Sequence, residues 1–134
     1  MGFIGCASAI AADDDADKTP MEKEMKIVST KLKELRKMKK EDKAYYENGA
    51  KAVREAHEAL LRSMAFQPVL VKDMKDGDEK LIALADSRRL MGLTYANLCE
   101  LEVAYLKKDE KLIGELASKW KSLKKEGHKK YTDD

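Results

Sequence analysis

Residues 19–37, TPMEKEMKIVSTKLKELRK, decide the fold of this 134-residue chain. They open with a capping threonine, a proline at the first helical position and Glu22 three residues after the cap, which together form a capping box. Apolar residues then recur at spacings of four, three, four and three, namely Met21, Met25, Val28, Leu32 and Leu35. This spacing predicts a helix over residues 20–37 with one apolar stripe that faces a partner.

Three further segments repeat this spacing. The first predicts a helix over about 42–66 that ends before Pro68 and carries Tyr46, Ala50, Val53, His57, Leu60 and Met64 on its stripe. Pro68 and Asp76-Gly77-Asp78 then predict a loop over 67–77. The next helix spans about 78–106, and its stripe carries Leu81, Leu84, Met91, Tyr95, Leu98 and Tyr105 together with Arg88 and Glu102. Because of these two charged residues, its inward face is the least well defined of the four.

The last helix follows the turn Lys107-Lys108-Asp109 and ends near Tyr131, with Ile113, Leu116, Ala117, Trp120, Leu123 and Gly127 on its stripe. Four amphipathic helices with short or moderate connections favour antiparallel neighbours. We therefore expect an all-α domain over residues 20–134, an up-down-up-down antiparallel four-helix bundle. Only seven glycines and two prolines among 134 residues agree with a helical protein.

The first dozen residues, MGFIGCASAIAA, carry no charge and lead into an acidic stretch, Asp13-Asp14-Asp15-Ala16-Asp17. We interpret residues 1–19 as the remnant of an export signal followed by a flexible acidic segment, which predicts a periplasmic protein. Two processing sites compete. Ala9-Ile10-Ala11 fits simple cleavage, which we favour, and Phe3-Ile4-Gly5-Cys6 resembles a lipobox that would attach a lipid anchor at Cys6. Either route leaves Cys99 without an intrachain disulfide partner.

The predicted topology places the start of the first helix and the end of the last helix at the same end of the bundle. Met25 lies about 7 Å inside that end and His128 about 5 to 8 Å inside it. His57 lies about 13 Å from the end, too deep to bind one metal ion together with Met25, and we interpret it as a buried or edge histidine. A thioether opposite an imidazole is a ligand pair that saturates a haem iron and suits electron transfer.

The residues Met25-x-x-Val28-x-x-x-Leu32-Lys33-x-Leu35 and Leu123-x-x-x-x-His128-x-Lys130-Tyr131 resemble the cytochrome b562 family. The resemblance covers residues 20–131 and rests mainly on the two terminal helices. It implies a periplasmic bundle that holds haem b non-covalently, with Met25 and His128 as the axial iron ligands and Met21 as the alternative one turn earlier. The residues before His128 are Lys124-Lys125-Glu126-Gly127, not the C-x-x-C motif of covalent attachment.

Some positions depart from that family. Its members pack an aromatic ring from the third helix against the haem, whereas the first half of the 78–106 segment has no aromatic residue, so Leu84 and Met91 would form the apolar wall together with Leu60 and Met64. For these four residues, ordinary core packing is the alternative. Lys124, one turn before His128, and Thr132, one turn after it, stand where a propionate-binding arginine is expected. Gly127 costs about 1 kcal/mol of helix stability relative to alanine, which is explained if something large approaches that backbone or if the helix frays there.

The function we expect is single-electron transfer by a monomeric b-type cytochrome with an unidentified redox partner protein. A net charge of +2 argues against a nucleic-acid binder, and the sequence has no Gly-rich phosphate loop or hydrolase motif, so we expect no enzyme. No stretch has the ~18 consecutive apolar residues of a membrane span. The alternative function is that of a haem-free bundle of the same family, acting as an envelope binding or stress-response protein.

Overall fold

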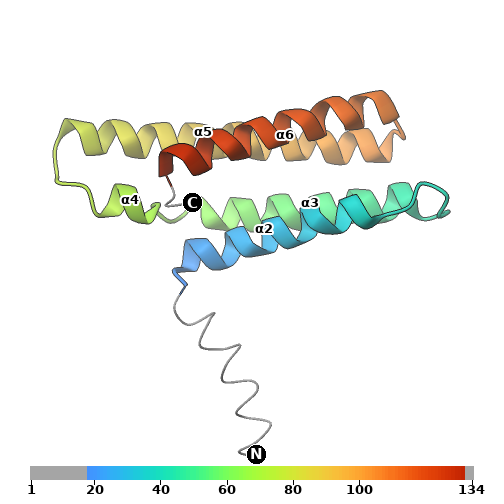
Figure 1. The fold of residues 1–134 in the computed structure, drawn as a ribbon, viewed down its shortest axis with the longest axis horizontal. Helices are drawn as coiled ribbons and strands as arrows, with labels where there is room; N and C mark the ends of the chain where they lie inside the picture. Colours follow the sequence, from blue (N-terminus) through green and yellow to red (C-terminus); the bar gives the residue numbers. More distant parts are fainter. Residues whose placement is uncertain (1–17, 132–134) are drawn as a thin grey trace, which may run out of the picture.

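The structure is a computed structural model that describes residues 18–131. Its helices are α2 (Pro20–Lys37), α3 (Tyr45–Ser63), the short α4 (Val69–Lys72), α5 (Asp78–Leu106) and α6 (Glu110–Tyr131). The four long helices pack antiparallel, each against the next one along the chain, and α4 lies in the connection between α3 and α5 (Figure 1). The predicted fold, an all-α up-down-up-down four-helix bundle, is confirmed.

The capping box fixes the start of α2 as predicted. The Thr19 hydroxyl accepts a hydrogen bond from the Glu22 amide at 3.2 Å, and Glu22 Oε1 accepts one from the Thr19 amide at 3.0 Å. Val28 and Leu32 from the predicted stripe are buried against the neighbouring helix. Local capping and the apolar stripe together therefore determine both the boundaries and the buried face of this helix.

The predicted helix over 42–66 is three residues too long at each end. Asp42 Oδ1 accepts a hydrogen bond from the Ala44 amide at 3.0 Å, and this turn delays the start of α3 until Tyr45. The helix ends at Ser63, whose buried hydroxyl donates to the Leu60 carbonyl. The predicted loop over 67–77 contains α4, a single helical turn that buries Val71.

The α5 stripe was predicted wrongly at its beginning, because Leu81 is 66% exposed. Figure 1 shows the reason: α5 begins beyond the points where α2 begins and α6 ends, so its first turns have no long helix to pack against. Further along α5 the stripe residues Leu98 and Tyr105 are buried, as predicted. Leu90, Leu101 and Ala104 are also buried.

Consecutive helices form three packed pairs, α2 with α3, α3 with α5, and α5 with α6. Within the described residues, α2 and α6, the pair that would close the ring, do not pack directly along their lengths. The core therefore runs mainly through α3 and α5, where Val53, Leu60 and Leu98 are almost fully buried. The backbones of the first and last helices therefore lie further apart than those of the three packed pairs.

The two ends of the bundle differ. At the end formed by the α2–α3 and α5–α6 turns, the Tyr45 ring packs against the rings of Tyr46 and Tyr105, at centroid distances of 5.0 and 5.9 Å. Gly49 lets α3 approach this cluster closely, since a methyl group there would lie 2.3 Å from Cε1 of Tyr105. Aromatic rings therefore fill this end, whereas the opposite end, where α2 begins and α6 ends, contains a cavity.

Among residues 18–131, no helix is long and apolar enough to cross a membrane. The predictions for the export signal, for Cys6 and for Thr132 fall outside the described residues. Cys99 lies half-buried on α5.

Candidate functional site

A cavity of about 630 Å³ lies at the end of the bundle where α2 begins and α6 ends. This volume falls within the range of about 300–1,000 Å³ that is usual for ligand pockets. Met25 contributes to its α2 side and His128 to its α6 side, so the two predicted iron ligands line one cavity. They come from α2 and α6, which are not among the closely packed helix pairs.

The other predicted site residues divide into two groups. Leu60 on α3, Met91 on α5 and Lys124 on α6 line the cavity, as does Met21, the alternative ligand. Met64 and Leu84 do not line it. Met64 is the half-buried cap residue after α3, and Leu84 lies on α5 one turn before the first cavity residue of that helix, Ser87.

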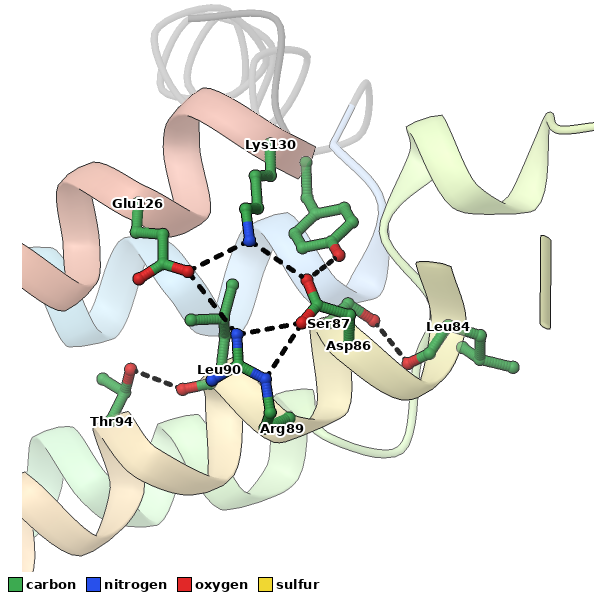
Figure 2. Close-up of polar contacts among 9 residues, drawn as sticks. Leu84, Asp86, Ser87, Arg89, Leu90, Thr94, Glu126 and Lys130 are labelled. Atoms are coloured by element: carbon green, nitrogen blue, oxygen red, sulfur yellow. Dashed lines mark hydrogen bonds and ion pairs between the residues drawn. The ribbon is translucent and has the colours of Figure 1, made fainter. Parts of the chain in front are cut away.

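Most of the α5 wall is made by residues that the sequence analysis did not single out, namely Ser87, Leu90 and Thr94. The Ser87 hydroxyl donates to the Leu84 carbonyl at 2.8 Å, and the Thr94 hydroxyl donates to the Leu90 carbonyl at 2.7 Å (Figure 2). Because both donors are satisfied within their own helix, this wall is suited to an apolar ligand face. Their helical spacing in α5 could have indicated this wall, but serine and threonine are polar and do not stand out as part of an apolar stripe.

The α6 wall combines an aromatic ring with an open stretch of backbone. Trp120 is 7% exposed and lines the cavity together with Leu123. Gly127 also lines it, and a methyl group at Gly127 would meet no atom within 4 Å. The space that the glycine leaves open lies directly beside the backbone of His128, which is what a bulky ligand bound to this imidazole requires.

Polar side chains and the inter-helix connection complete the cavity. Lys18, Lys26 and Lys124 line it and supply positive charge for an anionic substituent. Pro68, Val69 and Leu70 line it from the connection between α3 and α5. The sequence analysis missed this contribution because a one-turn helix gives no periodic signal.

A cluster of polar side chains joins the last turn of α6 to α5 next to the cavity (Figure 2). The Tyr131 hydroxyl donates a hydrogen bond to Asp86 Oδ2, and Arg89 Nε donates to Asp86 Oδ1 at 2.9 Å. Lys130 Nζ lies 3.5 Å from Asp86 Oδ2 and 3.1 Å from Glu126 Oε2. Glu126 in turn lies 3.5 Å from an Arg89 nitrogen.

These contacts shift the pKa values of Asp86 and Tyr131 in opposite directions. Hydrogen bonds from Tyr131 and Arg89 lower the pKa of the Asp86 carboxyl below its usual value. Burial and the hydrogen bond to Asp86 raise the pKa of Tyr131 to about 12. At neutral pH the acceptor is therefore ionised and the donor keeps its proton, so the bond between them is charge-assisted.

His57, the second histidine of the chain, lies outside the cavity, as the depth argument predicted. Its Nε2 lies 2.6 Å from Glu102 Oε1, and the side chain is 11% exposed. Arg54 Nε donates to the other oxygen of Glu102 at 2.9 Å. Glu102, the charged residue that made the inward face of its helix ambiguous, therefore binds two side chains of α3.

A second hollow, of about 520 Å³, lies at the opposite end, beside the turn after α2. Its lining is mainly charged and polar, with Lys37, Lys39, Glu41, Asp42 and Asn48 around Met38 and Tyr45. It lacks the combination of a soft ligand, an imidazole and apolar walls that distinguishes the cavity between α2 and α6.

Comparison of the chain with protein-family models, with curated proteins and with solved structures finds no match.

Proposed function

We propose that this protein is an exported b-type cytochrome that holds one haem non-covalently between α2 and α6 and carries single electrons. The observation that carries the proposal is that Met25 of α2 and His128 of α6 line the same cavity. When bound, the haem iron would supply a one-electron redox centre. In this proposal the Met25 thioether and the His128 imidazole are the axial ligands.

The remaining lining residues fit such a ligand. Leu60, Leu90, Met91 and Trp120 offer apolar surface to a flat macrocycle, and Gly127 leaves space beside the histidine. Lys18 and Lys124 line the cavity and supply positive charge for carboxylates. Among residues 18–131, no aromatic residue of α5 lines the cavity, and the indole and phenol rings in its wall are those of Trp120 and Tyr131.

The two neutral ligands and the apolar walls of the cavity would each have a distinct role in electron transfer. With Met25 and His128 both binding it, the iron would be suited to electron transfer rather than to oxygen activation, and the Met25 thioether would raise its reduction potential. The apolar walls would reduce the contact of the group with water, and this would limit the change in solvation when the charge changes. The basic residues beside the cavity favour the approach of an acidic redox partner.

The proposal is tested by titrating the purified protein with hemin and recording absorption spectra of the oxidised and reduced forms. We expect one equivalent to bind and to give sharp low-spin α and β bands on reduction. Met25→Leu, which conserves volume, and His128→Ala should each abolish the six-coordinate spectrum. Met21→Leu tests the alternative ligand and should leave the spectrum unchanged.

The chain offers a matched control for each ligand. Met64→Leu changes a methionine outside the cavity, and His57→Gln changes the other histidine while keeping a donor for Glu102. Both controls should bind hemin like the wild type. A folded, helical wild type that leaves the hemin spectrum unchanged would overturn the proposal in favour of the haem-free binding or stress-response protein.

A further inference from the structure

The last turn of α6 has reasons to be locally unstable. Gly127 lowers the helix propensity of this turn, which is the last turn of the helix that the structure describes. His128 lies within it, three residues before the helix ends at Tyr131. An imidazole on a frayed turn would spend much of its time away from the cavity.

Contacts with α5 tie this turn down on both sides of His128. Glu126, two residues before it, lies 3.5 Å from Arg89, and Lys130 and Tyr131, after it, both contact Asp86 (Figure 2). Arg89 and Asp86 also bind each other at 2.9 Å. Asp86 therefore sits at the centre of the cluster, with contacts to Arg89, Lys130 and Tyr131.

We propose that Asp86 is a positioning residue for His128: through Tyr131 and Lys130 it holds the last turn of α6 against α5, so that the imidazole faces the cavity before any ligand binds. Asp86 does not itself line the cavity, whereas Tyr131 does. The inference rests on the proposed function for its consequence in haem binding. The ordering of the turn is a separate property of the chain that can be measured without haem.

The opposite end of the same helix supplies a matched control. Tyr46 Oη donates to Glu110 Oε1 at 2.9 Å, which is also a tyrosine–carboxylate bond, here between α3 and the first turn of α6. Tyr131→Phe and Tyr46→Phe each delete one hydroxyl from such a bond. They differ in which end of α6 they release, so a general loss of stability affects both variants alike.

The experiment measures amide hydrogen exchange of the haem-free protein and then hemin binding, in the wild type, Tyr131→Phe, Asp86→Asn and Tyr46→Phe. In Tyr131→Phe we expect the amides of residues 126–131 to exchange about tenfold faster. We also expect several-fold weaker hemin binding and part of the bound hemin in a five-coordinate, high-spin spectrum. Asp86→Asn, which keeps an acceptor but loses the charge, should give smaller changes in the same direction. Tyr46→Phe should change none of these at residues 126–131.

Two results would overturn the inference. One is unchanged exchange at residues 126–131 in Tyr131→Phe and Asp86→Asn. The other is an equal loss of hemin affinity in Tyr131→Phe and Tyr46→Phe, because a merely structural role would produce it. If the wild type binds no hemin, only the proposed function is refuted. The amide hydrogen exchange of the haem-free protein then decides whether Asp86 orders this turn.

Discussion

Single residues decide how closely the helices of this bundle approach each other. Gly49 is buried where α3 meets the Tyr105 ring, and a methyl group there would lie 2.3 Å from that ring. Gly114, on the exposed side of α6, would meet no atom within 4 Å. Packing therefore requires a glycine at Gly49, whereas it places no such requirement on Gly114.

Gly49→Ala should destabilise the protein by about 1–2 kcal/mol, because displacing the buried ring costs more than alanine gains in helix propensity. Gly114→Ala should instead stabilise it by up to about 1 kcal/mol. Urea unfolding followed by circular dichroism measures both. A Gly49→Ala protein as stable as the wild type would contradict the close approach of α3 and α5 at this point.

At the scale of the helices, α3 and α5 are joined by more than apolar packing. Glu102 of α5 receives hydrogen bonds from His57 and Arg54 of α3. Burial raises the pKa of Glu102, but the hydrogen bonds from His57 and Arg54 together outweigh it, and the net shift is downwards. A carboxyl with a lowered folded pKa contributes stability above its ordinary value of 4.5, and that contribution is lost as the pH falls through the folded pKa.

Glu102→Gln should therefore lower the free energy of unfolding at pH 7 by about 1 kcal/mol. The difference from the wild type should shrink as the pH falls below 4.5. Glu100→Gln, at an exposed position of the same helix, is the control and should have little effect at either pH. Urea midpoints at pH 7 and pH 3 give the comparison, and a difference that does not depend on pH would contradict a role for the ionised carboxylate.

The helices differ in how far their sequences define them. α2 was predictable to the residue because its cap and its apolar stripe are local. The inward face of α5 could not be predicted in the same way. Glu102 faces inward because its two partners, 45 and 48 residues away in the sequence, bind it there. Leu81 is exposed because the beginning of α5 extends beyond the neighbouring helices. α4 is too short for periodicity, so its contribution to the cavity could not be predicted.

The candidate site was predictable in part for similar reasons. Helix counting from the ends predicted similar depths for Met25 and His128, and both residues line one cavity. The cavity itself depends on the separation of α2 and α6, which no local pattern encodes. Asp86 and Tyr131 are 45 residues apart, and only the packed bundle shows that they meet.

At the scale of the whole molecule, one end is filled by aromatic rings and the other contains the cavity. Gly127 has two opposing effects. It lowers the stability of its helix, and it leaves open space in the cavity at the position where the methyl group of an alanine would lie. Gly127→Ala should stabilise the haem-free protein by up to about 1 kcal/mol and weaken hemin binding several-fold. Gly114→Ala in the same helix should stabilise it without affecting hemin binding. Equal hemin affinities of both variants would mean that no ligand approaches this backbone.

Trp120, the one tryptophan of the chain, lines the cavity and is almost completely shielded from solvent. The protein thus carries its own fluorophore at the proposed binding site. A haem would quench its emission by energy transfer, whereas a colourless apolar ligand would leave the intensity largely intact and shift the wavelength. The ultraviolet fluorescence of the unlabelled protein can therefore distinguish the two classes of occupant, even in a mixture of candidate ligands.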